Sequence, residues 1–261
     1  MKFGVYFLCS LVALAETTGN RVIDDALAAL GGEKFLAVKD RVETGRAYSF
    51  YRDQLTGLAK AKIYTRYLDK SSPGHLAQRE RQSFGKDDDQ IILFLPENAY
   101  QITYRGARPL QAERFARYLE STHKNIFYIL RHRLKEPGLT FESKTATVWQ
   151  NTPVEIVDIT DADNNTVTVY FHRTTKLPVR QVFNRRDPKT KQRHEEVSIF
   201  SKYRDVGGGV QWPFAIIAER NKEKLFELYS ETVAVNQGLT DDLFTLPGGM
   251  KVLPAEKSTL P

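Results

Sequence analysis

The sequence has almost no cysteine, and this scarcity excludes several kinds of chemistry. Its 261 residues include a single cysteine, Cys9, which lies in an apolar N-terminal segment. We expect that segment to be removed, so the remaining chain would hold no disulfide and no reactive thiolate. The remaining length is sufficient to bury a large core within one domain.

Long apolar runs are also missing, except at the N-terminus. The run Phe3–Leu14 follows a lysine and ends in an alanine-x-alanine arrangement, which is typical of a secretory signal peptide. We therefore expect residues 1–15 to be cleaved before Glu16. A transmembrane anchor needs about 20 apolar residues. A lipoprotein signal would need a small residue directly before Cys9, where the sequence has leucine.

Charge of one sign is not concentrated in any part of the chain. The 38 basic and 32 acidic residues give a net charge of +6 and are interspersed. We expect no nucleic-acid partner, although an anionic membrane surface or an acidic partner is compatible with this balance.

Recognisable catalytic motifs are absent. The sequence has no nucleophile elbow, phosphate-binding loop, dinucleotide fingerprint or zinc-protease motif. Its histidines are too far apart for a metal site, and the acidic run at residues 87–89 lacks the spacing of a calcium loop. We expect no catalytic residue, no cofactor and no metal. The histidines are His75, His123, His132, His172 and His194.

The hydrophobic pattern predicts a mainly β protein with two helical segments. Apolar spacing over residues 20–30 predicts a short amphipathic helix, and similar spacing over about 110–136 predicts one long helix. Elsewhere the pattern alternates with a period of two between turn residues, which predicts about eleven or twelve short antiparallel strands. No composition shift divides the chain, so we expect residues 16–261 to form a single domain.

Apolar residues at alternating strand positions are predicted to share one face of the sheet. A long and a short helix offer little cover for so many strands, so part of that face could remain open to an apolar ligand. The alternative is that the helices fill the face and every one of these residues is ordinary core. The predicted lining residues are Tyr48, Phe50, Ile63, Tyr67, Leu93, Ile102, Phe127, Val169, Phe171, Trp212 and Phe214.

Three segments resemble a known family. The closing stretch "FTLPGGMKV" (244–252) and the hairpins "LAKAKIYTRYLDKSSPGHLAQRER" and "KDDDQIILFLPENAYQITY" are similar to patterns of the LolA/LolB-like superfamily of periplasmic lipoprotein carriers. The resemblance implies an α+β fold. In that fold a curved antiparallel sheet forms an incomplete β-barrel, covered on its concave side by the N-terminal and mid-chain helices. The closing stretch would fold back as an edge strand. Arg46 and Arg52 stand nearest to the functional arginine of the family.

The resemblance also implies a function. We expect a periplasmic, monomeric, non-catalytic carrier or chaperone that binds lipid or lipoprotein acyl chains in an apolar half-barrel cavity. Its further partners would be membrane-bound donor and acceptor proteins. An alternative is an envelope sensor or assembly module that grips a protein partner with the same curved sheet. A third hypothesis is an enzyme whose mechanism uses none of the known motifs. The sequence does not support it, because no acid, base and nucleophile stand together in it.

Overall fold

A computed structural model describes residues 6–255 except 71, 73 and 87, without the side chains of residues 6–17. The chain forms two compact units. Unit 1 comprises the described residues of Met1–Leu36 and Asn125–Leu225, and unit 2 those of Ala37–Lys124 and Phe226–Pro261. The expected single domain remains a prediction. Part of the predicted signal peptide lies outside the described residues.

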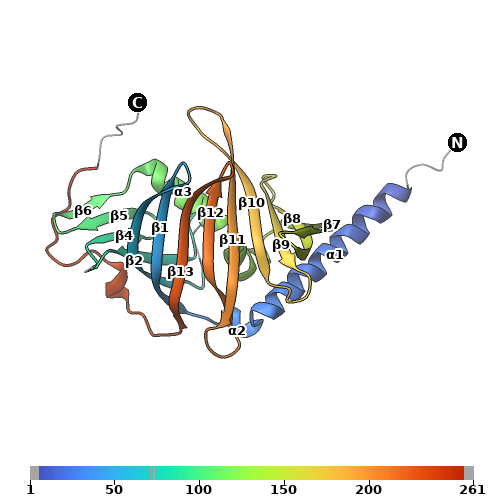
Figure 1. The fold of residues 1–261 in the computed structure, drawn as a ribbon, viewed down its shortest axis with the longest axis horizontal. Helices are drawn as coiled ribbons and strands as arrows, with labels where there is room; N and C mark the ends of the chain where they lie inside the picture. The colour runs from blue at the N-terminus through green and yellow to red at the C-terminus, as the bar shows by residue number, and fades with distance from the viewer. Residues whose placement is uncertain (1–5, 71, 73, 87, 256–261) are drawn as a thin grey trace. The chain divides into compact units, whose positions relative to one another are not determined.

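Unit 1 is an antiparallel meander with helices packed on it (Figure 1). Its strands follow one another in sequence order, from β7 to β12. The strands are β7 (Thr140–Trp149), β8 (Thr152–Thr160), β9 (Thr166–His172), β10 (Pro178–Arg186), β11 (Arg193–Asp205) and β12 (Gln211–Arg220). The helices are α1 (Tyr6–Leu30), α2 (Glu33–Leu36), α4 (Ile126–Tyr128) and the π-helix η1 (Ile129–Arg133).

Helix α1 packs against the sheet of unit 1 along an apolar stripe. It contacts β7, β8 and β12, and in Figure 1 it runs beside β7 and β8. A side chain on Gly19 would place its Cβ 2.1 Å from the carbonyl oxygen of Phe141, so glycine allows the helix to approach β7 closely. The helix contributes to the core at i, i+1, i+4 and i+8 spacing, as the sequence predicts for residues 20–30. The buried residues of this stripe are Val22, Ile23, Ala26 and Leu30.

Unit 2 is a second antiparallel meander. Its strand order is β6-β5-β4-β3-β2-β1-β13. The strands are β1 (Asp40–Tyr51), β2 (Gln54–Tyr67), β3 (Gln78–Phe84), β4 (Gln90–Phe94), β5 (Ala99–Thr103), β6 (Gly106–Pro109) and β13 (Glu223–Val235), which begins at the end of unit 1. The unit also contains α3 (Ala112–His123) and the 3-10 helix η2 (Asp241–Phe244). The predicted antiparallel, mainly β fold is confirmed. At the two ends of the strand order, β6 and β7 each have one neighbouring strand, so the order does not close into a barrel.

The predicted long helix over residues 110–136 is wrong as one element. Helix α3 ends at His123, and a new helical segment begins at Ile126. Between them Asn125 is extended, with φ −72° and ψ 132°, and its side chain accepts a hydrogen bond from the backbone N–H of Phe127 at 2.9 Å. This is an N-cap. The apolar spacing continues across the break, so the hydrophobic pattern alone does not reveal it.

The sheet of unit 2 has two faces with different cover. We call the side on which α3 packs the helix face: the ring of Tyr118 in α3 stacks on Phe94 with 3.6 Å between centroids. We call the opposite side the tail face, because residues 239–250 pack on it. Phe244 is buried there against Leu93 and Ile102.

The C-terminal segment is tied to unit 2 along its length. Asp40 accepts hydrogen bonds from three consecutive backbone N–H groups, at residues 237–239, over 2.6–3.1 Å. Farther on, Asp241 pairs with two arginines of β2 and β3 at 2.8 and 2.6 Å. Val252 then forms a parallel bridge with Ala107 of edge strand β6. In the described part of this segment, the expected edge strand is a single bridge to β6, and the segment covers part of the tail face, as the expected lid strip would.

Candidate functional site

Five of the predicted lining residues belong to unit 1, where they form packed core. Phe127 of α4 contacts the rings of Phe200 and Trp212, at centroid distances of 5.0 and 4.8 Å. Val169 and Phe171 are 0% exposed. Cross-strand pairing through β9, β10, β11 and β12 places Val169 and Phe214 on the same face. The structure brings these five residues together as interior packing.

The six predicted residues of unit 2 do not share one face, so this part of the prediction is wrong. Pairing of β1 with β2 sets Glu43 opposite Ile63 and sets Tyr48 opposite Leu58, so Ile63 and Tyr48 point to opposite sides. Ile63 and Tyr67 belong to the helix face. Leu93 and Ile102 belong to the tail face and are buried under the C-terminal segment. Tyr48 and Phe50 also lie on the tail-face side, farther along the sheet.

The side of β1 that is buried on the helix face is partly polar. The hydrophobic pattern predicts the other side of this strand, with Tyr48 and Phe50, to be the buried one. The buried residues of this strand are odd-numbered over most of its length, beginning with Arg41 and Glu43. Val42, Tyr48 and Phe50 alternate correctly, but they lie on the less buried side. In an alternating pattern, a charged residue is taken as exposed and its apolar neighbour as buried. The pattern therefore cannot reveal a strand whose charged side is the buried one.

Arg41 is the centre of a buried polar cluster that the sequence reading missed. Its guanidinium donates to the Thr65 hydroxyl at 3.1 Å and to the Tyr67 hydroxyl at 3.2 Å. Its Nε lies 3.5 Å from the carboxylate of Glu43, which also accepts a hydrogen bond from Ser230. Burial alone would lower the pKa of Arg41, but the nearby Tyr67, Glu43 and Glu80 outweigh it and raise that pKa.

Glu80 of β3 completes this cluster. It accepts hydrogen bonds from the Gln82 amide at 2.6 Å and from the Thr65 hydroxyl at 3.4 Å. Burial raises the pKa of Glu80, and Arg41 only partly opposes the shift. The cluster therefore holds two carboxylates and one guanidinium on a face that was expected to be apolar. Buried charges of this kind are tolerated only when hydrogen bonds satisfy them.

The arginines that the family resemblance pointed to are both exposed. Arg46 forms a surface ion pair with Glu231 at 3.1 Å, and Arg52 lies over the ring of Tyr51 at 5.3 Å from its centroid. The buried arginine of β1 is Arg41.

Where α3 packs on the sheet, apolar side chains of both the helix and the sheet remain half-exposed. None of the twelve residues of α3 is buried, although its Phe115 and Leu119 are partly covered. On the sheet, Ile63 and Ile92 share the helix face and are also only half-buried. The Gln78 amide donates a hydrogen bond to the Tyr118 hydroxyl at 3.1 Å. Tyr118 as a whole is half-buried, but the poor access of water to its hydroxyl raises the pKa of Tyr118. Helix α3 is thus attached to the helix face at a few points and leaves apolar surface incompletely covered.

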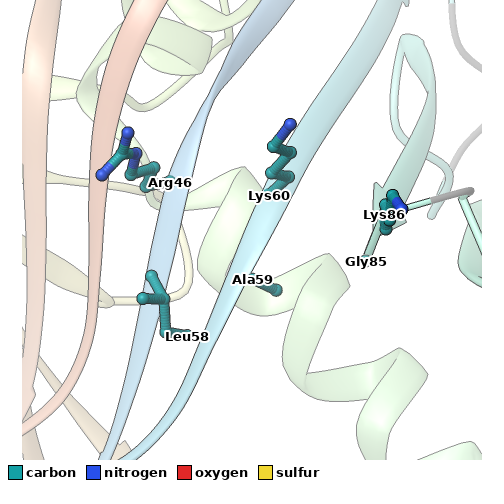
Figure 2. A pocket seen from close by; sticks show the side chains of 6 residues that line it. All are labelled: Arg46, Leu58, Ala59, Lys60, Gly85 and Lys86. Carbon is teal, nitrogen blue, oxygen red and sulfur yellow. The ribbon is translucent and has the colours of Figure 1, made fainter.

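A surface groove of about 350 Å³ lies beside the β1–β2 hairpin (Figure 2). Arg46 of β1 and Lys60 of β2 line it from adjacent strands, and Lys86 lines it from beyond the end of β3. The apolar part of the lining comes from Leu58 and Ala59. Among the described residues, those that line the groove include no carboxylate.

Metal chemistry finds no support in the part of the chain that the structure describes. There, no cluster of three or more histidine, cysteine, aspartate or glutamate side chains could hold an ion. Asp87 of the acidic run lies outside the described residues. Within the same described ranges, no helix is long and apolar enough to cross a bilayer.

Comparisons with known proteins establish the fold but not the family. No protein-family profile matches the sequence, and no curated protein matches it. Among solved structures, a DUF1329 family protein from Desulfovibrio piger is 12% identical and has a TM-score of 0.59, with 87% of this chain and 97% of that chain covered.

Two further solved structures are named for lipoprotein sorting and for the LolA superfamily. A putative outer membrane lipoprotein-sorting protein domain from Vibrio parahaemolyticus is 11% identical, covers 88% and 97% of the two chains, and has a TM-score of 0.55. A LolA superfamily protein from Nitrosomonas europaea is 11% identical, covers 87% and 97%, and has a TM-score of 0.52. The chain therefore has the LolA-like fold.

Proposed function

We propose that the protein is a non-catalytic periplasmic carrier that binds lipid or lipoprotein acyl chains between α3 and the helix face of unit 2. The observation that carries this proposal is the incomplete cover of apolar surface under α3, where no helix residue is buried. Its fold is shared with proteins named for lipoprotein sorting and for the LolA superfamily, which supports the same reading.

The free energy gained by burying an acyl chain is sufficient for binding without any covalent step. Removing apolar surface from water contributes about 25 cal/mol per Å², so an acyl chain that buries a few hundred Å² would gain several kcal/mol. Ile63, Ile92 and Phe115 supply part of the apolar surface for such a chain. The Arg41–Glu80 cluster makes hydrogen bonds within unit 2, to Thr65 and from Gln82.

Periplasmic location and membrane-bound donor and acceptor proteins belong to the same proposal. They depend on the expected signal peptide of residues 1–15 and on the fold. A carrier of this kind would receive its cargo from one membrane protein and deliver it to another.

The experiment compares two substitutions at neighbouring positions of β2. Ile63→Asp introduces a charge on the helix face opposite Glu43. It should reduce binding of a fluorescent fatty-acid probe by at least about tenfold, because a carboxylate without a partner is costly beside an acyl chain. Lys62→Asp changes the opposite, exposed side and should bind the probe like the wild type. Circular dichroism would establish that both variants are folded.

The proposal would be overturned by wild-type protein that carries no lipid in native mass spectrometry and binds no acyl probe. A folded Ile63→Asp protein with wild-type affinity would equally exclude the helix face as the site. Crosslinking in cells that recovers one protein partner, together with no lipid, would favour the envelope-sensor alternative instead.

A further inference from the structure

The β1–β2 hairpin ends in a group of exposed apolar side chains. Tyr51, Leu55 and Leu58 are 64%, 56% and 59% exposed, and they are three of the six large hydrophobic residues that are exposed in the described part of the chain. All three lie within eight residues of one another, on the two strands that meet at the Arg52-Asp53 turn. Isolated exposed leucines need no explanation, but a cluster at a hairpin end indicates an interaction surface.

Folding of unit 2 does not account for these residues. On the tail face, the C-terminal segment covers Leu93 and Ile102 of β4 and β5. The hairpin end lies outside that cluster. The strand pairing shifts register between Ser49 and Phe50 and then continues to the last pair, Tyr51 with Gln54. The hairpin therefore closes through its backbone and needs no apolar side chain at its end.

Basic side chains lie farther along the same hairpin, where Arg46 pairs with Lys60. Arg46, Lys60 and Lys86 line the adjacent groove, and Leu58 belongs to both the exposed group and the groove (Figure 2). Arg52 adds a further guanidinium, stacked over Tyr51.

Two of the described acidic groups near the groove form ion pairs. Asp88 pairs with Lys62 at 3.3 Å, and Glu231 pairs with Arg46 at 3.1 Å. Asp89 lies against the backbone of Gly85.

We infer that the end of the β1–β2 hairpin docks on the surface of an anionic lipid bilayer. Tyr51, Leu55 and Leu58 enter the headgroup region, and Lys60 and Lys86 contact lipid phosphates from the groove. Apolar and aromatic side chains flanked by lysine and arginine are the combination that binds at such an interface. Charge complementarity selects an anionic surface over a neutral one. This contact would bring the carrier to a membrane, which is a role separate from holding the cargo.

The test uses the full chain and vesicle co-sedimentation. The wild type should bind vesicles of phosphatidylethanolamine and phosphatidylglycerol, with affinity that falls as salt rises, and should bind phosphatidylcholine vesicles weakly. The double variant Leu55→Asp/Leu58→Asp should lose at least about tenfold in affinity. The double variant Lys60→Glu/Lys86→Glu should lose at least about tenfold, since each basic residue near an anionic surface accounts for roughly fivefold.

Val148→Asp provides the matched control, because Val148 is 65% exposed but lies on β7 of unit 1. It should bind vesicles like the wild type. The inference fails if the wild type does not bind anionic vesicles, if it binds phosphatidylcholine equally well, or if Val148→Asp is as impaired as the leucine variant. Binding of inorganic phosphate without binding of vesicles would identify a free-anion site and would also contradict it.

The acyl-probe assay separates this inference from the proposed function. Leu55→Asp/Leu58→Asp should keep wild-type binding of the soluble probe, and Ile63→Asp should keep vesicle binding. Loss of both activities in either variant would contradict the separation of the two surfaces.

Discussion

The side-chain oxygen of Gln181 accepts a hydrogen bond at 2.9 Å from the backbone N–H of Ile126, inside unit 1. Gln181 lies on β10 and is 1% exposed. The first N–H groups of a helix have no partner within the helix, and here a strand side chain satisfies one of them while Asn125 satisfies another. The sheet thus fixes the point at which the second helical segment begins.

Replacing Gln181 by leucine should destabilise unit 1. The substitution removes the acceptor and leaves the Ile126 N–H buried without a partner, which costs about 1–3 kcal/mol. Urea unfolding of Gln181→Leu should show a lower midpoint than the wild type. Gln192→Leu, at an exposed position of a hairpin loop, is the control and should unfold close to the wild-type midpoint. Equal midpoints for the two variants would contradict the role of Gln181.

Glu80 should make the stability of unit 2 decrease as pH rises. Burial raises the pKa of Glu80 above its ordinary value of 4.5, so the folded state holds its proton more tightly than the unfolded state. The stability that follows is fully present below pH 4.5 and is lost as pH rises through the raised folded pKa. Subtracting the free energy of unfolding of Glu80→Gln from that of the wild type across this range should reveal the loss. A difference that does not change with pH would contradict the prediction. The control Glu97→Gln, at an exposed position, should differ from the wild type by an amount that does not depend on pH.

His132 should have the opposite effect, at lower pH. Its burial, together with the charge of Arg131, lowers the pKa of His132 from 6.5 to about 4. Because the folded pKa is depressed, the unfolded state takes up the proton first. The stability that His132 contributes is therefore present above pH 6.5 and lost as pH falls toward 4. His132→Gln should unfold with a weaker dependence on pH in that interval, which thermal melts at several pH values would measure. An unchanged dependence would refute this assignment.

Phe244 should anchor the C-terminal segment to the tail face. It is 1% exposed and packs against Leu93 and Ile102, so Phe244→Ala should cost about 3–5 kcal/mol in the free energy of unfolding. Phe115→Ala removes the same side chain from α3, where it is only half-buried, and should cost much less. Denaturant titration of the two variants gives the comparison. Similar losses would mean that α3 is packed as firmly as the C-terminal segment.

The sequence by itself determined the kind of secondary structure and much of its order. Alternation in "TVTVYFH" predicts a strand, and the structure places β9 there. The apolar spacing of residues 20–30 predicts the buried stripe of α1. These features depend on neighbours within a few residues, so a local pattern contains them.

Only the tertiary structure decided which side of each strand meets which partner. Val42 and Tyr48 alternate with Arg41 and Glu43, and a period of two cannot tell which set will be buried. The pairing of β1 with β2 and the packing of α3 and Phe244 on opposite faces settle it. For the same reason the break at Asn125 depends on Gln181, which lies 55 residues beyond Ile126 along the chain. Contacts between residues so distant in sequence leave no trace in local periodicity, because they form only when the sheet is assembled.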